Sequence, residues 1–137
     1  MSQNAKPKAR VLSVGQCGYD HGQISRSVRQ RFGFEVDRAD TPVEAVKALR
    51  GGSYALVLVN RLMDLDGSPG LELVRTIKSD LSLAGTPVML VSNYPDAQSS
   101  AVALGALPGF GKSQLDTAVY VERMTAALAQ TEAGKPT

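Results

Sequence analysis

The sequence predicts an α/β fold: a five-stranded parallel sheet, doubly wound, of the flavodoxin-like type. Two observations lead to this prediction. Short apolar runs rich in β-formers alternate along the 137 residues with segments whose apolar residues recur at helical spacing. Such alternation favours crossover connections, which make neighbouring strands parallel and place helices on both faces of the sheet. We expect one domain at residues 10–130, between flexible tails at 1–9 and 131–137.

Five apolar runs supply the strands, which we expect at about 10–14, 34–39, 54–59, 86–93 and 106–112. The run 54–59, YALVLV, is continuous and rich in β-formers, as is typical of a strand covered on both faces. The run 34–39 alternates apolar and polar residues and predicts a more exposed strand. The run 106–112 is the weakest of the five.

Two helices carry clear end signals. Ile24, Val28 and Phe32 recur every four residues and predict a helix at about 21–32, which Gly33 terminates. The second helix lies within 41–52, TPVEAVKALRGG. Its threonine caps the helix and the glutamate three residues later completes a capping box.

Three further helices follow from spacing alone. One contains Leu71, Val74 and Ile77, and a short helix of small residues covers 96–105. The last helix is marked roughly by four apolar residues: Leu115, Val119, Met124 and Leu128.

Composition narrows the range of functions. The formal charge is +2, and the basic residues are not interleaved with aromatic ones, so no direct nucleic-acid partner is expected. No apolar run reaches the roughly 20 residues of a membrane span. The start, MSQNAKPKAR, lacks an apolar signal-peptide core, which predicts a cytoplasmic protein with no membrane partner. A single cysteine, Cys17, excludes an internal disulfide and a cysteine-rich zinc site.

Polar or small residues stand where the predicted strands end. Gly15 and Gln16 follow the first strand, Asn60 ends the third, Ser92 the fourth and Lys112 the fifth. The carboxyl ends of parallel strands meet at one edge of the sheet, where ligands bind in open α/β folds. The candidates at this edge are therefore these five residues, Asn93, and the polar residues of the loops after the first and third strands.

The chain resembles the receiver domains of bacterial response regulators (the CheY-like family) over about residues 10–130. The matching stretches are VLSV, YALVLVN followed by DG and GLELVRTIK, TPVMLVSN, and GALPGFGK. The resemblance implies a family pattern of an acidic pair, a phosphoacceptor aspartate, a Ser/Thr and a lysine at successive strand ends. Ser92 and Lys112 match this pattern. Gly15 and Gln16 replace the acidic pair, and Asn60 replaces the phosphoacceptor.

These replacements predict a degenerate phosphorylation pocket. Phosphoryl transfer to a side chain needs an anionic oxygen nucleophile, and Mg²⁺ prefers carboxylate oxygens, but Gly15, Gln16 and Asn60 offer neither. We therefore expect no cofactor, loss of Mg²⁺ binding, and no enzymatic activity.

The predicted function is that of a pseudo-receiver, a phosphorylation-independent protein–protein interaction module in a two-component or phosphorelay pathway. The resemblance implies an output surface over residues of about 96–130, with a protein partner or a second copy of the chain as its occupant. Five residues in or near that surface are the candidate contacts: Tyr94, Phe110, Val119, Tyr120 and Met124.

The pocket residues are open to more than one interpretation. Ser92 and Lys112 are remnants, or they bind an anion, or Lys112 hydrogen-bonds the side-chain oxygen of Asn60. A small-molecule or anion sensor would use Gln16 together with these three residues.

The loops beside the pocket contain acidic residues and two reactive side chains. Asp64 or Asp66 is an atypical phosphoacceptor, or both form a relocated metal site with Asp20, although acids in such a sequence more often favour a turn. Asp20 is expected to cap the first helix. Two further hypotheses for the loop after the first strand are redox sensing by Cys17 and a role of His21 as a ligand or phosphoacceptor.

Overall fold

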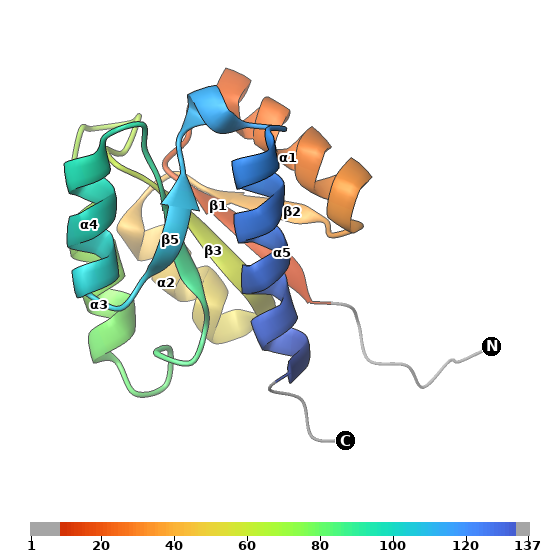
Figure 1. The fold of residues 1–137 in the computed structure, drawn as a ribbon. Helices are drawn as coiled ribbons and strands as arrows, with labels where there is room; N and C mark the ends of the chain where they lie inside the picture. Colours follow the sequence, from red (N-terminus) through yellow and green to blue (C-terminus); the bar gives the residue numbers. More distant parts are fainter. Residues whose placement is uncertain (1–8, 134–137) are drawn as a thin grey trace.

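A computed structural model describes residues 9–133 and contains five strands that alternate with five helices (Figure 1). The elements are β1 (Arg10–Val14), α1 (Gly18–Phe32), β2 (Val36–Ala39), α2 (Pro42–Gly51), β3 (Tyr54–Asn60), α3 (Gly70–Ser79), β4 (Val88–Val91), α4 (Pro95–Ala103), β5 (Leu107–Phe110), a short 3₁₀ turn η1 (Lys112–Gln114) and α5 (Ala118–Ala133).

The strands form one parallel sheet in the order β2-β1-β3-β4-β5. Figure 1 shows α1 and α5 covering one face, whereas α2, α3 and α4 pack on the other. This arrangement confirms the predicted doubly wound α/β fold. None of the helices within residues 9–133 has the length and apolar character needed to cross a membrane.

The central strand β3 explains the uninterrupted apolar run. Its residues from Ala55 to Val59 are fully buried. Val57 and Val59 point into the cluster beneath α2, α3 and α4, whereas Leu56 and Leu58 point into the cluster beneath α1 and α5. Because both faces are covered, every position of the strand has to be apolar until Asn60, which is half-buried at its end.

The Thr41 cap and the Gly33 terminus read from the sequence are confirmed. The predicted capping box is not complete, because Glu44 reaches the N–H of Asp40 and not that of Thr41. The backbone N–H of Glu44 donates to Thr41 Oγ1 at 3.1 Å, and the Glu44 carboxylate accepts from the N–H of Asp40 at 2.9 Å. Gly33 adopts the left-handed conformation with φ of 74°, and its N–H donates to the Arg29 carbonyl.

Some predicted boundaries are wrong by a few residues. Helix α1 begins at Gly18, and Cys17 is its N-cap: Cys17 Sγ accepts from the N–H of Asp20 at 3.4 Å. Asp20 therefore lies in the first turn and is not the cap. Strands β4 and β5 are shorter than the predicted runs, and α5 extends to Ala133. The rest of the two predicted tails, residues 1–8 and 134–137, lies outside the described residues.

Three predicted surface residues are buried, and this prediction is therefore wrong for them. Phe110, Tyr120 and Met124 are each 0% exposed and belong to the cluster beneath α1 and α5. The Phe110 and Tyr120 rings meet edge to face, with centroids 4.7 Å apart. Aromatic residues on β5 and α5 bury a large apolar area by packing inward, so they support the surface from beneath and do not contact a partner.

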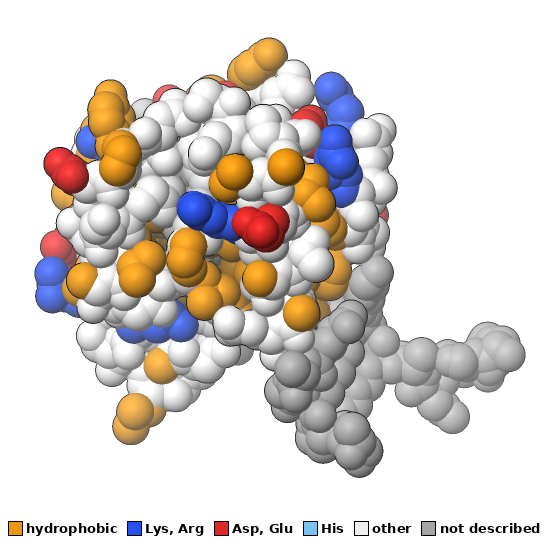
Figure 2. All heavy atoms as spheres, viewed as in Figure 1, with side chains coloured by type: hydrophobic (Ala, Val, Ile, Leu, Met, Phe, Trp, Pro, Cys, Tyr) orange, Lys and Arg blue, Asp and Glu red, His pale blue; other side chains and the backbone are white. Residues whose placement is uncertain are grey.

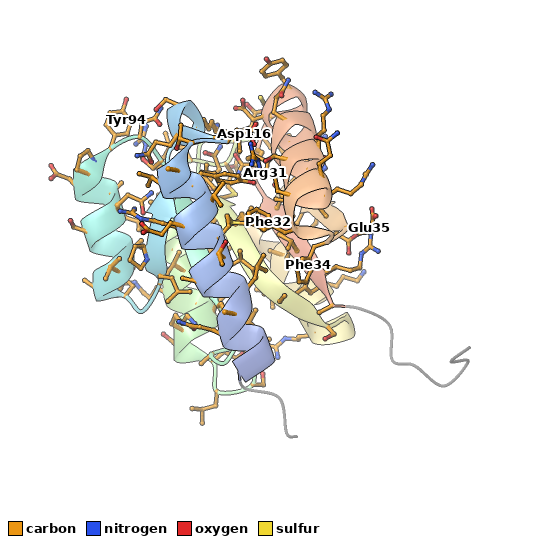
Figure 3. All side chains as sticks on the ribbon, turned by 45° about the vertical axis from the view of Figure 1, so that its right-hand side comes forward. Arg31, Phe32, Phe34, Glu35, Tyr94 and Asp116 are labelled. Atoms are coloured by element: carbon orange, nitrogen blue, oxygen red, sulfur yellow. The ribbon has the colours of Figure 1, made fainter. Side chains whose placement is uncertain are left out.

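The seam between α1 and α5 is closed by polar contacts. Ser27 Oγ donates to Asp116 Oδ1 at 2.6 Å and lies 2.9 Å from the Tyr120 hydroxyl. Figure 3 shows Arg31 and Asp116 together at this seam, where their side chains form an ion pair of 2.7 Å. These hydrogen bonds and Arg31 hold the pKa of Asp116 below its ordinary value.

Candidate functional site

The carboxyl edge of the sheet carries a pocket of about 240 Å³ between the ends of β3, β4 and β5. Asn60, Ser92 and Lys112, three of the five predicted site residues, line it together with Arg61, Leu62, Val91, Asn93 and Tyr94. Gly15 and Gln16 do not line the pocket. The structure thus brings together the β3, β4 and β5 residues of the predicted site and leaves the β1 residues apart.

Gly15 lies directly beneath Met63. Its φ is +77°, and a Cβ at this position would stand 2.5 Å from Met63 Sδ. Met63 itself is only 1% exposed. A side chain at position 15 would therefore be strained by the backbone and crowded by the methionine, so an acidic residue could not stand here without rearrangement.

Gln16 is buried just after the end of β1. It is 1% exposed, and among the described residues neither polar atom of its amide has a hydrogen-bond partner. Its backbone carbonyl accepts from Arg38 Nη2 at 3.5 Å. The anion sensor that the sequence suggested at this edge would therefore have to work without Gln16 in its lining.

Asn60 uses its amide as a donor. Asn60 Nδ2 donates to the Gly15 carbonyl at 3.0 Å and thereby ties the end of β3 to the end of β1. A carboxylate in this orientation would place one of its oxygens against the Gly15 carbonyl oxygen, and this contact is unfavourable because both atoms are acceptors. The amide is therefore the side chain that fits this packing.

Lys112 is paired with Asp20. Lys112 Nζ lies 2.7 Å from Asp20 Oδ2, and the two side chains are 34% and 25% exposed. Burial opposes ionisation of Asp20, but hydrogen bonds from Lys112 and Cys17 outweigh it and hold the pKa of Asp20 below its ordinary value. The expectation that Lys112 would bond the side-chain oxygen of Asn60 is wrong, because the aspartate in the first turn of α1 takes that role.

The β4–α4 loop is fixed to the β5–α5 turn. Ser92 Oγ accepts from the N–H of Tyr94 at 3.1 Å. Asn93 Oδ1 accepts from the N–H and the hydroxyl of Ser113, at 3.2 and 2.9 Å. These contacts leave the Ser92 hydroxyl hydrogen and the Asn93 amide nitrogen without a protein acceptor among the described residues.

Arg61 is a pocket residue that sequence reasoning missed. Its guanidinium carbon lies 4.6 Å from the centroid of the Tyr94 ring, and Tyr94 is 58% exposed. Figure 3 shows Tyr94 at the start of α4, away from the seam of α1 and α5. The sequence did carry a signal for Arg61: it directly follows Asn60, the last residue of the strand, and residues there lie at the functional edge of the sheet.

Gln98 joins α4 to the ends of β4 and β5. Its Nε2 donates to the carbonyls of Leu90 and Ser92 at 2.9 and 3.1 Å, and its Oε1 accepts from the N–H of Gly109 at 3.0 Å. A Cβ at Gly109 would stand 2.1 Å from the Leu90 carbonyl oxygen, so only glycine permits this close approach. One side chain therefore sets the position of α4 against two strands.

A second hollow of about 210 Å³ adjoins the first. Tyr19, Asp20, Gln23, Ile24, Lys112 and Leu115 line it. Lys112 thus borders both hollows, and its ion pair with Asp20 lies on the side of the second one.

The loop acids do not form a metal cluster. Asp66 Oδ1 accepts from the N–H and hydroxyl of Ser68, at 2.9 and 2.7 Å, which is the turn that the sequence favoured. Within residues 9–133, no three His, Cys, Asp or Glu side chains come together as metal ligands would. His21 Nδ1 is buried without a partner in the same part of the chain, and burial followed by Arg38 lowers the pKa of this histidine.

Comparison with known proteins concerns the fold. No protein-family profile matches the sequence. Among solved structures, the signal receiver domain of a DNA-binding response regulator from Colwellia psychrerythraea 34H superposes with a TM-score of 0.73 at 23% identity, over 90% of this chain and 99% of that one. The fold is that of a response-regulator receiver domain.

Two further receivers show the same likeness. The CheY-like receiver domain protein from Methanospirillum hungatei JF-1 gives a TM-score of 0.70 at 18% identity, over 94% of this chain and 100% of that one. The response regulator TrrA from Thermotoga maritima, solved in complex with Mg²⁺-BeF, gives 0.72 at 21%, over 88% and 99%. Receiver domains of this kind are signalling modules.

Proposed function

We propose that this chain is a pseudo-receiver, a receiver-fold module that signals through protein contact without phosphorylation in a two-component-type bacterial pathway in the cytoplasm. The observation that carries the proposal is the hydrogen bond from Asn60 Nδ2 to the Gly15 carbonyl at the end of β3. It gives the residue at the phosphoacceptor position a structural role that an amide can fill and a carboxylate cannot.

The surroundings of Asn60 support the proposal. An amide nitrogen is a poor nucleophile, and no carboxylate lines the pocket among the described residues. Mg²⁺ is usually held by one or two carboxylates together with other oxygens. Met63 occupies the space beside Gly15 where an acidic side chain would have to extend. We therefore propose that the chain neither binds Mg²⁺ nor accepts a phosphoryl group at this edge.

The proposed partner surface is the α4–β5–α5 face, formed by the exposed side chains of those three elements. It contains a hollow of about 290 Å³ lined by Leu107, Pro108, Glu122, Arg123, Ala126 and Gln130. Figure 2 shows apolar side chains around a basic and an acidic one near the centre of this face. Val102 on α4 is 43% exposed and extends the apolar area. Such a mixture suits a protein partner or a second copy of the chain.

The first test is intact-mass spectrometry after incubation with acetyl phosphate and Mg²⁺. We expect no phosphoryl adduct on the wild type, while a phosphorylatable receiver in the same tube gains one and shows that the donor is active. An adduct on the wild type would contradict the proposal. Its mapping to Asp64 or Asp66 would establish the atypical phosphoacceptor in its place.

The second test addresses the partner surface. Ala126→Glu places a charge in the hollow of the α4–β5–α5 face, whereas Val43→Glu places one on α2, where Val43 is 78% exposed. We expect Ala126→Glu to abolish co-purification with a partner, or self-association measured by sedimentation, and Val43→Glu to leave either unchanged. Equal behaviour of the two variants would exclude this face.

A further inference from the structure

The pocket at the ends of β3, β4 and β5 has the chemistry of an anion site. Two cationic side chains, Arg61 and Lys112, line it, and no acidic residue of the described chain does. We propose that this pocket reversibly binds a small oxyanion, either inorganic phosphate or the carboxylate of a small metabolite. The inference goes beyond the proposed function and holds whichever surface contacts a partner.

The lining is rich in donors that the protein does not use. The Ser92 hydroxyl accepts a bond from Tyr94 and retains its own hydrogen to donate. Asn93 uses only its oxygen, on Ser113, so its amide nitrogen remains available among the described residues. With the guanidinium of Arg61, which stacks on Tyr94 without an ion-pair partner in the described chain, the pocket presents neutral and charged donors together. Oxyanions are bound by such sets of donors.

Asn60 removes the main obstacle to an anion. A carboxylate at this position would repel an oxyanion at contact distance, and more strongly in a site shielded from water. The neutral amide does not. Its Nδ2 is turned toward the Gly15 carbonyl, so Asn60 contributes no charge to the pocket wall. The replacement that prevents phosphorylation thus opens the pocket to a free anion.

The ion pair of Lys112 with Asp20 is compatible with the proposal. An ammonium group has three hydrogens, and the bond of 2.7 Å to Asp20 uses one of them. Asp20 does not line this pocket but the adjoining hollow. The pair therefore positions the ammonium group at the pocket wall, with hydrogens left for a ligand.

The backbone around the cations is already fixed. The Gly70 N–H donates to the Arg61 carbonyl at 2.7 Å, and Leu62 forms an antiparallel bridge with Pro69. On the opposite side, Asn93 is held by Ser113. A pocket of about 240 Å³ has room for a phosphate or a short carboxylate, and little loop ordering is needed for binding.

The test is an NMR titration of the full chain with sodium phosphate, sodium sulfate and sodium acetate, at constant ionic strength set with sodium chloride. We expect saturable shifts of the Arg61, Asn93 and Lys112 amides in the wild type. Tetrahedral and planar anions are distinguished by which salt saturates at the lower concentration. Arg61→Gln should weaken binding at least about tenfold, because one charged donor is lost. Asn60→Asp should weaken it as well, by repulsion.

Lys47→Gln is the matched control, since it removes one positive charge from an exposed position on α2. It should leave the affinity unchanged. The proposal is overturned if no anion gives saturable shifts at the pocket, or if Lys47→Gln and Arg61→Gln weaken binding equally. Neither result of the titration would change the outcome of the phosphorylation test. The two proposals can therefore fail independently of each other.

Discussion

On the β1 side of Asn60 the carboxyl edge of the sheet is closed, and on the β4 side it is open. The closed side is neutral: Gly15 lies under Met63, and Gln16 is buried. The open side is a pocket with Arg61 and Lys112 in its wall. The difference teaches that side-chain packing divides this edge into two halves. Met63 and the buried Gln16 fill the space at the end of β1, whereas the ends of β4 and β5 leave a pocket open.

The largest expected effect concerns the closed side. Gly15→Ala and Gly67→Ala both force a side chain into positive φ, +77° and +74°, but only position 15 has neighbours within 4 Å of the added Cβ. The backbone strain should cost about 1–2 kcal/mol at both positions. Crowding against Met63 should add about 1–3 kcal/mol at position 15. Urea unfolding of the two variants measures the loss of free energy of unfolding in each. Equal losses in Gly15→Ala and Gly67→Ala would show that Met63 does not close this side.

A smaller effect is expected from the hydrogen bonds of Gln98 on the open side. Gln98→Ala removes three hydrogen bonds to the carbonyls of Leu90 and Ser92 and the N–H of Gly109. Loss of these partners should cost about 1–3 kcal/mol and should speed hydrogen exchange at the Gly109 amide. Gln30→Ala, at an exposed position of α1, is the control and should change neither quantity. Unchanged exchange in Gln98→Ala would mean that the open side is held by other contacts.

The smallest effect is the pH dependence of the Lys112–Asp20 pair. The pKa of Asp20 lies below its ordinary value of 3.8, so the folded state favours the ionised form. The pair therefore stabilises the fold above that value, and this contribution disappears as the pH falls through the lower pKa of the folded state. We expect Asp20→Asn to cost about 0.5–1 kcal/mol at neutral pH and nothing in strong acid.

Thermal unfolding of the wild type and Asp20→Asn from neutral pH down to strong acid measures this difference. Asp64→Asn, which removes a carboxylate from an exposed position of the β3–α3 loop, is the matched control. A difference in thermal stability between the wild type and Asp20→Asn that stays constant across this pH range would show that Lys112 does not stabilise the ionised form of Asp20.

The fold could be predicted from the sequence because strand ends and helix ends carry local signals. The run 54–59 corresponds to β3, and Asn60, Ser92 and Lys112 were placed correctly at one edge because parallel strands align their carboxyl ends. The Lys112–Asp20 pair was missed, since the two residues are far apart in the sequence and meet only where the first turn of α1 lies beside the turn η1 that follows β5. The cap was misassigned because cysteine rarely takes that role.

The surface residues of α5 were misjudged for a different reason. Tyr120, Met124, Ala127 and Leu128 recur at helical spacing and form the buried side of the helix. This pattern is present in the sequence, and the predicted helix already included Met124 and Leu128, but it took the half-buried Val119 in place of Tyr120. A tyrosine also looks like an interface residue, and only its hydroxyl contact with Ser27 shows why a polar tip is tolerated inside.

Lys112 borders both hollows at the carboxyl edge, so ligands bound in the two hollows would be linked thermodynamically through this one side chain. Under the proposed anion binding, an anion that draws the ammonium group toward β3 would free Asp20 for a cationic group in the second hollow, and a cation paired with Asp20 would free Lys112 for the anion. By reciprocity, each event changes the affinity for the other by the same factor. Occupation of one hollow would therefore change the affinity of the other through the Lys112 side chain alone, without any movement of the strands.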